Sequence, residues 1–452
     1  MKIYEKYTTY PTLWNASFPS HWDVLPMYAV AREKSVCNCE DLPLLSVYLD
    51  VGVIPFSAKA EKRTNVTSKD LSKYQRVDYG DFVLNNQQAW RGSVGVSFYT
   101  GIVSPAYIVL SMSDLLDSKY ANYLLRSHVM VDQYLINSKS VGSIQRNIYW
   151  PALKRVKIPV PPRSEQDQIV KFLDWKVSFI NKLINIKQRQ INNFNEKLLV
   201  DINHLITRGI RLHSDYIKTE IDWAPIIPSN WTVSRIRNHF EIQKRIAGTE
   251  GFDVFSVTQQ GLKVRDINLC EGQLATNYSG YQFVYPGEFA MNHMDLLTGG
   301  VGIADHLGVT SPDYRVFKLI DDNHCYAPYF LKIFQVCYRR HAFYRFGRGA
   351  ANVGRWRLPA TAFKNFEIPI PPFEEQIEIV NVIDKKEDAI KTAIESFKHQ
   401  VVVLQEFKTR LIADVVTGKI DVRDIEIPEY EFVEEETDST VADSEDEEGT
   451  EK

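Results

Sequence analysis

The sequence predicts an α+β protein made of two globular domains joined by two long helices that pack antiparallel as a coiled coil, with a disordered acidic C-terminal tail. Three observations lead to this fold class. The 452-residue chain repeats itself once at a constant offset. Each copy contains one long stretch with the apolar spacing of a coiled coil. Each stretch follows a region in which short β-rich runs accompany a helical piece. We expect a pseudo-two-fold internal repeat within one chain.

The repeat is clearest where the two helices open. IPVPPRSEQDQIV starts at Ile158, and IPIPPFEEQIEIV starts at Ile368. A second matching pair opens the two domains, namely PSHW at Pro19 and PSNW at Pro228. A duplication of this kind means that one structural unit occurs twice. We therefore divide the chain into a first domain, a central helix, a second domain, a distal helix and an acidic tail, with boundaries at 1–157, 158–210, 211–367, 368–420 and 421–452.

Both domains show the same order of short elements. In the first, FVLNN at Phe82 and YIVL at Tyr107 are β-rich, and a helical piece runs from Asp117 to Leu135. In the second, GEFAMN at Gly287 matches the β-rich run GDFVLN, and the helical piece runs from Ala327 to Phe346. We expect each domain to be small, with a mostly antiparallel and irregular sheet.

Both helices carry start and stop signals. The paired prolines end an extended segment, because each proline disfavours helix in the residue before it. Ser164 is the predicted N-cap of the first helix, and Gly209 and Gly418 are the predicted ends. Apolar residues alternate at spacings of three and four, as in a coiled-coil seam: Val170, Leu173, Val177, Ile180, Ile184, Ile191, Phe194, Leu198, Ile202 and Leu205, then Val380, Ile383, Ile390, Ile394, Phe397, Val401, Leu404, Leu411 and Val415.

Each helix of some 45 residues is a rod of roughly 65 Å, and its apolar seam needs a partner. The simplest partner is the other helix, running antiparallel, because the second domain must carry the chain back. The alternative is that each helix packs only on its own domain. A short domain cannot cover so long a stripe, which favours the helix pair.

Composition narrows the class of protein. Five cysteines without a CxxC pair fit neither a zinc ribbon nor a disulfide framework, so we expect a reducing cytoplasm and no metal. We also expect no membrane segment, because no apolar run approaches about 20 residues, and the N-terminus does not look like a signal peptide.

The net charge of -4 is unevenly distributed along the chain: residues 424–452 carry fourteen acidic side chains and one lysine. The rest of the chain has a net charge of +9, which suits an anionic partner.

Residues 421–452 have little to bury, and we expect them to be disordered. A solubilising tail is one interpretation, and a weak electrostatic competitor for the basic surface is the other.

The motifs of common catalytic sites are missing from the sequence. It has no GxxxxGK[ST] loop, no GxGxxG in a strand-to-helix context and no NPPY-like or DPPY-like tetrapeptide. The nearest approach to a nuclease motif is Pro312-Asp313 before Lys318, where Val316 replaces the needed acid. The histidines do not pair at metal-ligand spacing. We expect this chain to be non-catalytic and to hold no cofactor of its own.

The domains are instead rich in side chains that recognise DNA. Arginine binds guanine and phosphate, and asparagine and glutamine bind adenine. Such residues gather in KAEKR, NNQQAWR and SVGSIQRN in the first domain, and in NHMD and the arginine-rich run 338–357 in the second. For any single residue a solvated loop is the alternative, whereas the arginine-rich run as a whole favours DNA contact. The DNA-binding candidates are Lys59, Lys62, Arg63, Gln87, Gln88, Arg91, Gln145, Arg146, Asn147, Asn292, His293, Arg345, Arg348, Asn352 and Arg355.

The order of these segments resembles the specificity subunit of type I restriction-modification enzymes. A domain is followed by the proline-led segment IPVPPRSEQ and a long helix, and then come PSNW, a second domain and IPIPPFEEQ. The resemblance spans residues 19 to about 420. It implies two target recognition domains that each read half of a split DNA site, with the helices as a ruler. It implies that modification subunits dock on the helices, bind AdoMet and methylate adenine. Separate restriction subunits, up to two, supply ATP-driven translocation and cleavage with Mg²⁺.

The physical interpretation agrees with this resemblance. Two similar but non-identical readers on one rod predict a bipartite, asymmetric site on double-stranded DNA, with half-sites about 10 base pairs apart. The duplicated helices predict two docking faces, and hence two modification subunits per chain. Two alternatives stay open. One is a coiled-coil adaptor that binds no DNA, and the other is a fused enzyme with its own nuclease or methyltransferase activity.

Overall fold

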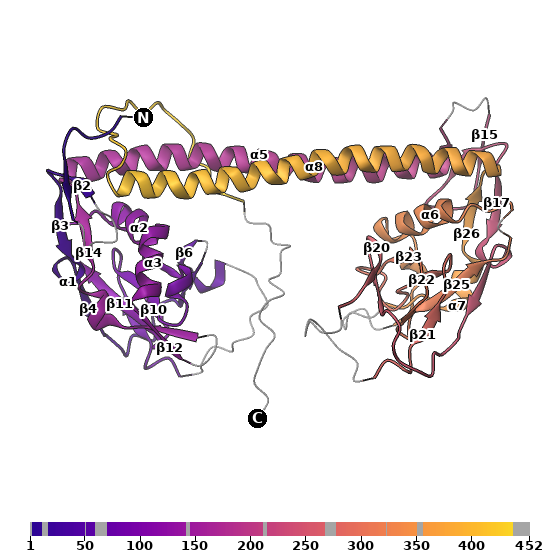
Figure 1. Cartoon of the computed structure of the whole chain (residues 1–452), viewed down its shortest axis with the longest axis horizontal. Coiled ribbons are helices and arrows are strands. Elements are labelled where there is room, and N and C mark those ends of the chain that lie inside the picture. The colour runs from indigo at the N-terminus through magenta and orange to yellow at the C-terminus, as the bar shows by residue number, and fades with distance from the viewer. Residues whose placement is uncertain are drawn as a thin grey trace. The chain divides into compact units, whose positions relative to one another are not determined.

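The computed structural model describes residues 2–10, 17–49, 51–58, 70–141, 145–210, 215–266, 277–321, 323–349 and 356–436. The chain divides into two compact units. The first unit is Met1–Gln188 with Lys398–Lys452, and the second is Arg189–Phe397. Each unit therefore contains one globular domain and part of both long helices (Figure 1).

The first unit is built on a four-stranded antiparallel sheet in the order β4 (Ala31–Lys34), β11 (Tyr107–Met112), β8 (Phe82–Asn85), β9 (Val94–Val96). Its side chains alternate between two cores, as strand geometry requires. Phe82 and Leu84 point into the core shared with the helices, whereas Val83 points into a smaller core beneath β5 and β6. The expected antiparallel sheet is present, and its two faces are both covered.

The remaining strands of this unit form short antiparallel pairs. They are β1 (Tyr7–Thr9) with β2 (Ser17–Pro19), β3 (Asp23–Pro26) with β14 (Lys157–Val160), β5 (Leu45–Tyr48) with β6 (Gly52–Pro55), β7 (Gln75–Val77) with β10 (Gly101–Val103), and β12 (Ser138–Val141) with β13 (Gln145–Ile148). Single-turn helices connect them: α1 (Met27–Val30), η1 (Phe56–Ala58), η2 (Ala89–Arg91) and α4 (Trp150–Leu153).

The helical piece expected at 117–135 is two helices rather than one. They are α2 (Ser118–Arg126) and α3 (His128–Ile136). Asp117 caps α2 by accepting hydrogen bonds from the amides of Lys119 and Tyr120. The break lies at Ser127, whose backbone is extended. The two helices lie between the sheet and the long helices (Figure 1), where Tyr120, Leu124 and Tyr134 are fully buried.

The second unit repeats this plan with the order β18 (Phe240–Gln243), β25 (Arg315–Leu319), β22 (Phe289–Met291), β23 (Val301–Ile303). The short pairs are β15 (Tyr216–Lys218) with β16 (Ile226–Pro228), β17 (Thr232–Arg235) with β26 (Glu367–Ile370), β19 (Phe255–Thr258) with β20 (Gly261–Val264), and β21 (Gln282–Val284) with β24 (Gly308–Thr310). The helical elements are η3 (Ile236–Asn238), α6 (Ala327–Arg339), η4 (Tyr344–Phe346) and α7 (Ala360–Asn365). Helix α6 is shorter than expected, because the chain turns at His341 with a positive φ of 55°.

The long helices are α5 (Arg163–Arg208) and α8 (Phe373–Val416). They begin later than the ranges 158–210 and 368–420, because the first residues of each range form β14 or β26 and a pair of prolines. The prediction of Ser164 as N-cap is wrong, since α5 already begins at Arg163 and the carbonyl of Pro162 accepts the amides at 165 and 166. The predicted glycine ends are confirmed by φ values of 75° at Gly209 and 73° at Gly418.

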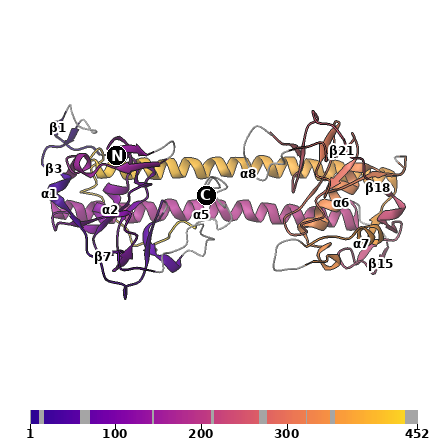
Figure 2. The ribbon, with the colours of Figure 1, turned by 90° about the horizontal axis from the view of Figure 1, so that it is seen from below.

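The predicted antiparallel seam is present in each unit. In the first unit the start of α5 packs on the end of α8, and Ile180, Ile184, Val401 and Leu411 share one buried core. In the second unit the end of α5 packs on the start of α8. There the rings of Phe194 and Phe397 stack with centroids 5.8 Å apart. Figure 2 shows the two helices side by side. Packing of each helix on its own domain alone is therefore excluded.

A tyrosine at matching positions of the two repeats joins each domain to both helices. Tyr120 Oη in the first unit lies 3.4 Å from the carbonyl oxygens of Pro159 and Val416. Its counterpart Tyr329 in the second unit lies 3.3 Å from those of Pro369 and Ile206. Each domain is therefore fastened to the start of the helix that follows it and to the end of the other helix.

A repeated glutamine makes a second identical connection. Gln166 accepts a hydrogen bond from the amide of Asp117 at 2.7 Å and donates to the carbonyls of Leu115 and Pro161. Gln376 does the same with the amide of Tyr326 at 2.8 Å and with two carbonyls of its own unit. Both side chains are at most 1% exposed. The glutamine repeats in sequence because it closes the same joint twice.

The predicted boundary of the disordered tail, residue 421, lies too early in the chain. Residues 421–436 lie along the long helices of the first unit, with a turn at 423–424, Val422 buried, and Ile425 and Ile427 packed on the core. Residues 437–452 lie outside the described part of the chain.

Replacing the joint glutamines should weaken one unit at a time. Gln166→Ala or Gln376→Ala leaves buried backbone groups without partners, at a cost of about 1–3 kcal/mol in the free energy of unfolding. Urea denaturation followed by hydrogen exchange should place the loss in the first unit for Gln166→Ala and in the second for Gln376→Ala. Gln260→Ala, at an exposed site, is the control. Equal weakening of both units by either variant would contradict this account.

Candidate nucleic-acid interface

The first candidate cluster forms a tight turn after β8. The amide of Gln88 donates to the carbonyl of Asn85 at 3.0 Å, and the amide of Arg91 donates to that of Gln88 at 2.9 Å. Gln87 and Arg91 are exposed and Gln88 is half-buried. The guanidinium of Arg91 lies 4.8 Å from the centre of the Trp90 ring. The turn therefore presents two amide side chains and one arginine on a fixed backbone.

The second cluster lies on the β12–β13 hairpin. Arg146 donates from Nε to the hydroxyl of Ser138 at 2.9 Å, and Asn147 pairs across the hairpin with Lys139. Lys139 Nζ lies 3.8 Å from the centre of the Tyr149 ring. Both Arg146 and Asn147 are half-buried. Gln145 begins β13, and its side chain is outside the described part of the structure.

One asparagine brings these clusters together. The amide of Ile148 donates to the carbonyl of Asn86 at 3.3 Å and to its side-chain oxygen at 2.9 Å. Residues 85–91 and 145–147 thus form one surface, which we call the first loop surface. Sequence alone singled out both segments but not their contact, because 50 or more residues separate them.

The second unit brings the matching segments together in the same way. The amide of Leu358 donates to the carbonyl of His293 at 2.9 Å, and the side chain of Asn292 accepts the amide of Met294 at 3.2 Å. Arg348 and Arg357 exchange backbone hydrogen bonds at 2.8 and 3.0 Å, which pair the two ends of this part of the arginine-rich segment. Residues 292–293, 348 and 357 form the second loop surface.

A glycine shapes this loop for an internal reason. Trp356 donates from Nε1 to the carbonyl of Tyr344 at 2.6 Å, and its ring lies against Gly347. A Cβ at Gly347 would lie 2.0 Å from Trp356 Nε1. Gly347 therefore makes room for the ring of Trp356.

Buried Arg315 was missed by the sequence analysis. It is 6% exposed, and its Nη2 donates to the carbonyl of Leu358 at 2.8 Å. Burial lowers its pKa to about 10. The matching residue of the first domain is the apolar Ile108. This difference between the two repeats is the sequence signal that could have singled out Arg315.

Arg315 and Arg357 lie beside His293. Burial first, and then these two cations, lower the pKa of His293 to about 4. His293 is therefore neutral near pH 7 and offers a donor and an acceptor, not a charge. Its Nδ1 is buried without a hydrogen-bond partner.

Arg345 is engaged within the protein. It forms an ion pair with Asp222, and its guanidinium lies 4.6 Å from the centre of the Phe346 ring. Five other candidates lie outside the described residues: Lys59, Lys62, Arg63, Asn352 and Arg355.

The described residues offer groups for hydrogen bonding and phosphate contact. Within these ranges, no group of three or more His, Cys, Asp or Glu side chains is placed to hold a metal ion. Among the described helices, none is long and apolar enough to cross a membrane. The arrangement suits recognition of an extended, anionic, hydrogen-bonding ligand, which is the chemistry of a DNA groove.

The low pKa of His293 predicts how stability depends on pH. Because this pKa lies below that of an unfolded histidine, the unfolded chain binds more protons, so stability falls as pH drops from about 6.5 to about 4. His293→Gln should make the loss of unfolding free energy between these pH values smaller by roughly 1–2 kcal/mol, after allowance for the partial exposure of the ring. Urea unfolding at about pH 7 and about pH 5 measures it. His399→Gln, at an exposed site, serves as control. An unchanged pH dependence in His293→Gln would show that His293 is not the titrating group.

Comparison with known proteins supports a role in DNA recognition. Residues 29–202 and 272–400 match the family described as type I restriction modification DNA specificity domain. The putative type I restriction enzyme MjaX specificity subunit of Methanocaldococcus jannaschii is 24% identical over 378 residues, which cover 79% of this chain and 82% of that protein. The MjaVIII specificity subunit of the same organism is 26% identical over 239 residues, or 50% of each chain.

A solved structure shares the fold. It comes from work on complex assembly and conformational transition of the type I R-M system. It superposes with a TM-score of 0.63 at 12% sequence identity, covering 89% of this chain and 99% of that one.

Proposed function

Because this chain belongs to the type I restriction-modification DNA specificity family, we propose that it reads a bipartite, asymmetric DNA site and directs partner subunits to that site. One observation carries the proposal. The same pair of loop segments meets in each domain, once through Asn86 and Ile148 and once through His293 and Leu358. A duplicated scaffold holds two surfaces in matching positions, as two half-site readers require.

The two surfaces differ in their side chains, which supports different half-sites. The first offers Gln87, Gln88 and Arg91, and the second offers Asn292, His293 and Arg348 in matching segments. Glutamine and asparagine read adenine, and arginine reads guanine or binds phosphate. Phosphate contacts would add affinity that falls steeply with salt. Lys59, Lys62, Arg63, Asn352 and Arg355 are proposed as further DNA contacts on the same grounds.

The helix pair is proposed as the ruler between the half-sites. An apolar seam would keep such a pair rigid, so that its length would fix the number of base pairs between the half-sites, near 10 from centre to centre. The same pair would dock two modification subunits, because each helix face occurs twice. Those subunits would bind AdoMet and methylate adenine, and up to two restriction subunits would use ATP and Mg²⁺.

The proposed function is tested by co-expressing this chain with a candidate adenine methyltransferase subunit and mapping methylated adenines on genomic DNA. A complex that methylates a split motif is the expected result. A chain that forms no complex and leaves the DNA unmethylated would contradict the proposal and favour an adaptor that binds no DNA.

Removing one arginine from each surface should affect one half-site each. Arg348→Ala should weaken binding about tenfold through one half-site, and Arg91→Ala through the other, because a bidentate contact contributes about 1–3 kcal/mol. Fluorescence anisotropy with duplexes altered in either half separates the two effects. Equal loss at both halves for either variant would refute separate reading.

Lengthening the helix pair should change the spacer alone. Four residues inserted after Gln188 and four after Phe397 add about one turn, or about 6 Å, to each helix. The methylated motif should keep both half-sites and change the number of bases between them. A motif with the original spacing would rule out the ruler.

A further inference from the structure

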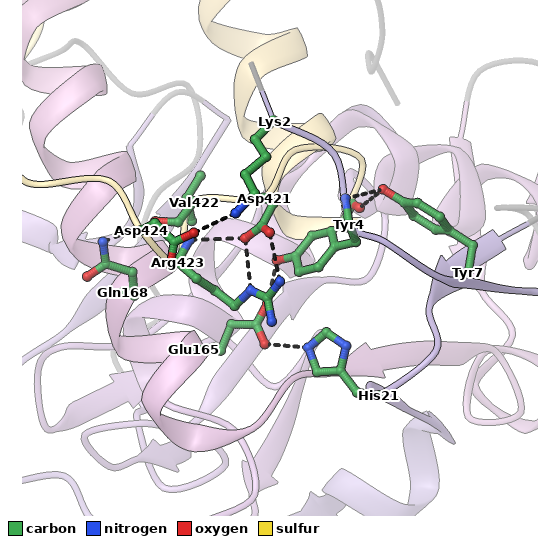
Figure 3. Close-up of polar contacts among 11 residues, drawn as sticks. Lys2, Tyr4, Tyr7, His21, Glu165, Gln168, Asp421, Val422, Arg423 and Asp424 are labelled. Atoms are coloured by element: carbon green, nitrogen blue, oxygen red, sulfur yellow. Dashed lines mark hydrogen bonds and ion pairs between the residues drawn. The ribbon is translucent and has the colours of Figure 1, made fainter.

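Residues 421–427 anchor the segment that follows α8. The amide of Asp421 donates to the carbonyl of Lys2 at 2.9 Å, and Asp421 is 2% exposed. Gln168 of α5 donates to the carbonyls of Val422 and Ile425 at 3.1 and 2.8 Å. Figure 3 shows Arg423 beside Asp421, to which it donates at 2.8 Å. This anchor is part of the folded first unit.

Residues 428–436, which we call the strap, continue along α5. Ser178 donates to the carbonyl of Glu431 at 2.9 Å and accepts the amide of Val433 at 2.8 Å. Asn181 donates to the carbonyl of Val433 at 3.1 Å. Asn185 donates to the carbonyl of Glu434 at 2.9 Å and accepts the amide at 436 at 3.0 Å. Spacings of three and four put these three side chains on one side of α5.

These α5 side chains form a track for the backbone of the strap. Ser178, Asn181 and Asn185 are 2%, 6% and 5% exposed, so the strap covers them. Helix α8 supplies the second wall, where Lys408 pairs with Glu435 and Gln405 donates to the same carboxylate at 2.9 Å.

The side chains of the strap point mainly to solvent. Glu431, Phe432, Glu434 and Glu436 are exposed, and Phe432 is 59% exposed. The helices therefore hold the backbone of the strap and one of its carboxylates. A segment held this way gives up much conformational freedom for few buried contacts, so it can leave without disturbing the core. Pro428 marks the change from the buried anchor to the exposed strap.

Among the described residues of the second unit, no segment corresponds to the strap. Gly418 ends the second repeat as Gly209 ends the first, and the chain after Gly209 forms β15, which matches β1. The positions that match Ser178, Asn181 and Asn185 are Asp388, Lys391 and Glu395, and all three are exposed. The strap thus breaks the two-fold similarity of the helix pair.

We propose that the strap is a detachable cover that competes with a modification subunit for the first-unit part of the helix pair. This inference rests on the proposed function, in which the duplicated helix faces dock two such subunits. On the matching second-unit face Asp388, Lys391 and Glu395 are exposed, so the first subunit binds there. The second subunit binds the first-unit face only as the strap leaves its track. The two docking sites for modification subunits are therefore filled in a fixed order.

Hydrogen exchange of the full chain tests the strap without any partner. The amides at 433 and 436 should exchange slowly in the natural sequence, because they donate to Ser178 and Asn185. The double variant Asn181→Ala/Asn185→Ala should lose that protection while the amides of α5 keep theirs. The matched control Lys391→Ala/Glu395→Ala should leave the strap protected. An unprotected strap in the natural sequence would overturn the proposal.

Titration with the modification subunit, read by native mass spectrometry, tests the competition. The natural sequence should bind a second subunit about tenfold or more weakly than the first, because the tethered strap competes at high effective concentration. The double variant should bring the two affinities close together. Equal sites in the natural sequence, or an unchanged difference in the double variant, would overturn the competition. Failure of both forms to bind any subunit, with the strap protected, would instead refute the proposed function and the competition with it.

Discussion

Each domain of this protein contacts both long helices, namely the helix that follows it in the chain and the helix that follows the other domain. The rest of the structure depends on this joint between a domain and the two helices. Tyr120 reaches the carbonyl of Val416 at the end of α8, and Tyr329 reaches that of Ile206 at the end of α5. Neither domain could keep this contact if the helices did not run antiparallel. The apolar seam holds the two helices together, and the path of the chain through the second domain makes them antiparallel. The tyrosines fix each domain on the helices.

This joint explains which residues repeat in sequence. Gln166 and Gln376 are retained in both copies because their amides close the same three hydrogen bonds at each helix start. The loop surfaces carry no such constraint, and their side chains differ between the copies. A duplicated chain can therefore keep one scaffold and hold two different binding surfaces on it.

The regular parts of this fold follow from local sequence. Seam spacing, paired prolines and the end glycines predict α5 and α8, and short β-rich apolar runs predict β8 and β22. What local sequence could not predict depends on contacts between distant residues. The turn at Asn86 meets Ile148 through the backbone carbonyl and the side-chain oxygen of Asn86. Buried Arg315 stands where the first repeat has an apolar residue. The docked strap was missed because its own composition is acidic, whereas the polar groups that bind it lie on α5.

Site-specific photo-crosslinking to DNA tests the central claim most directly, namely that each domain reads its own half of one site. A photoreactive residue would replace Gln87 in one chain and Asn292 in another, each bound with its modification subunit to a DNA fragment that contains the methylated motif. The account predicts that position 87 crosslinks to one half of the motif and position 292 to the other. Crosslinks from both positions to the same half, or from neither position to DNA, would contradict it.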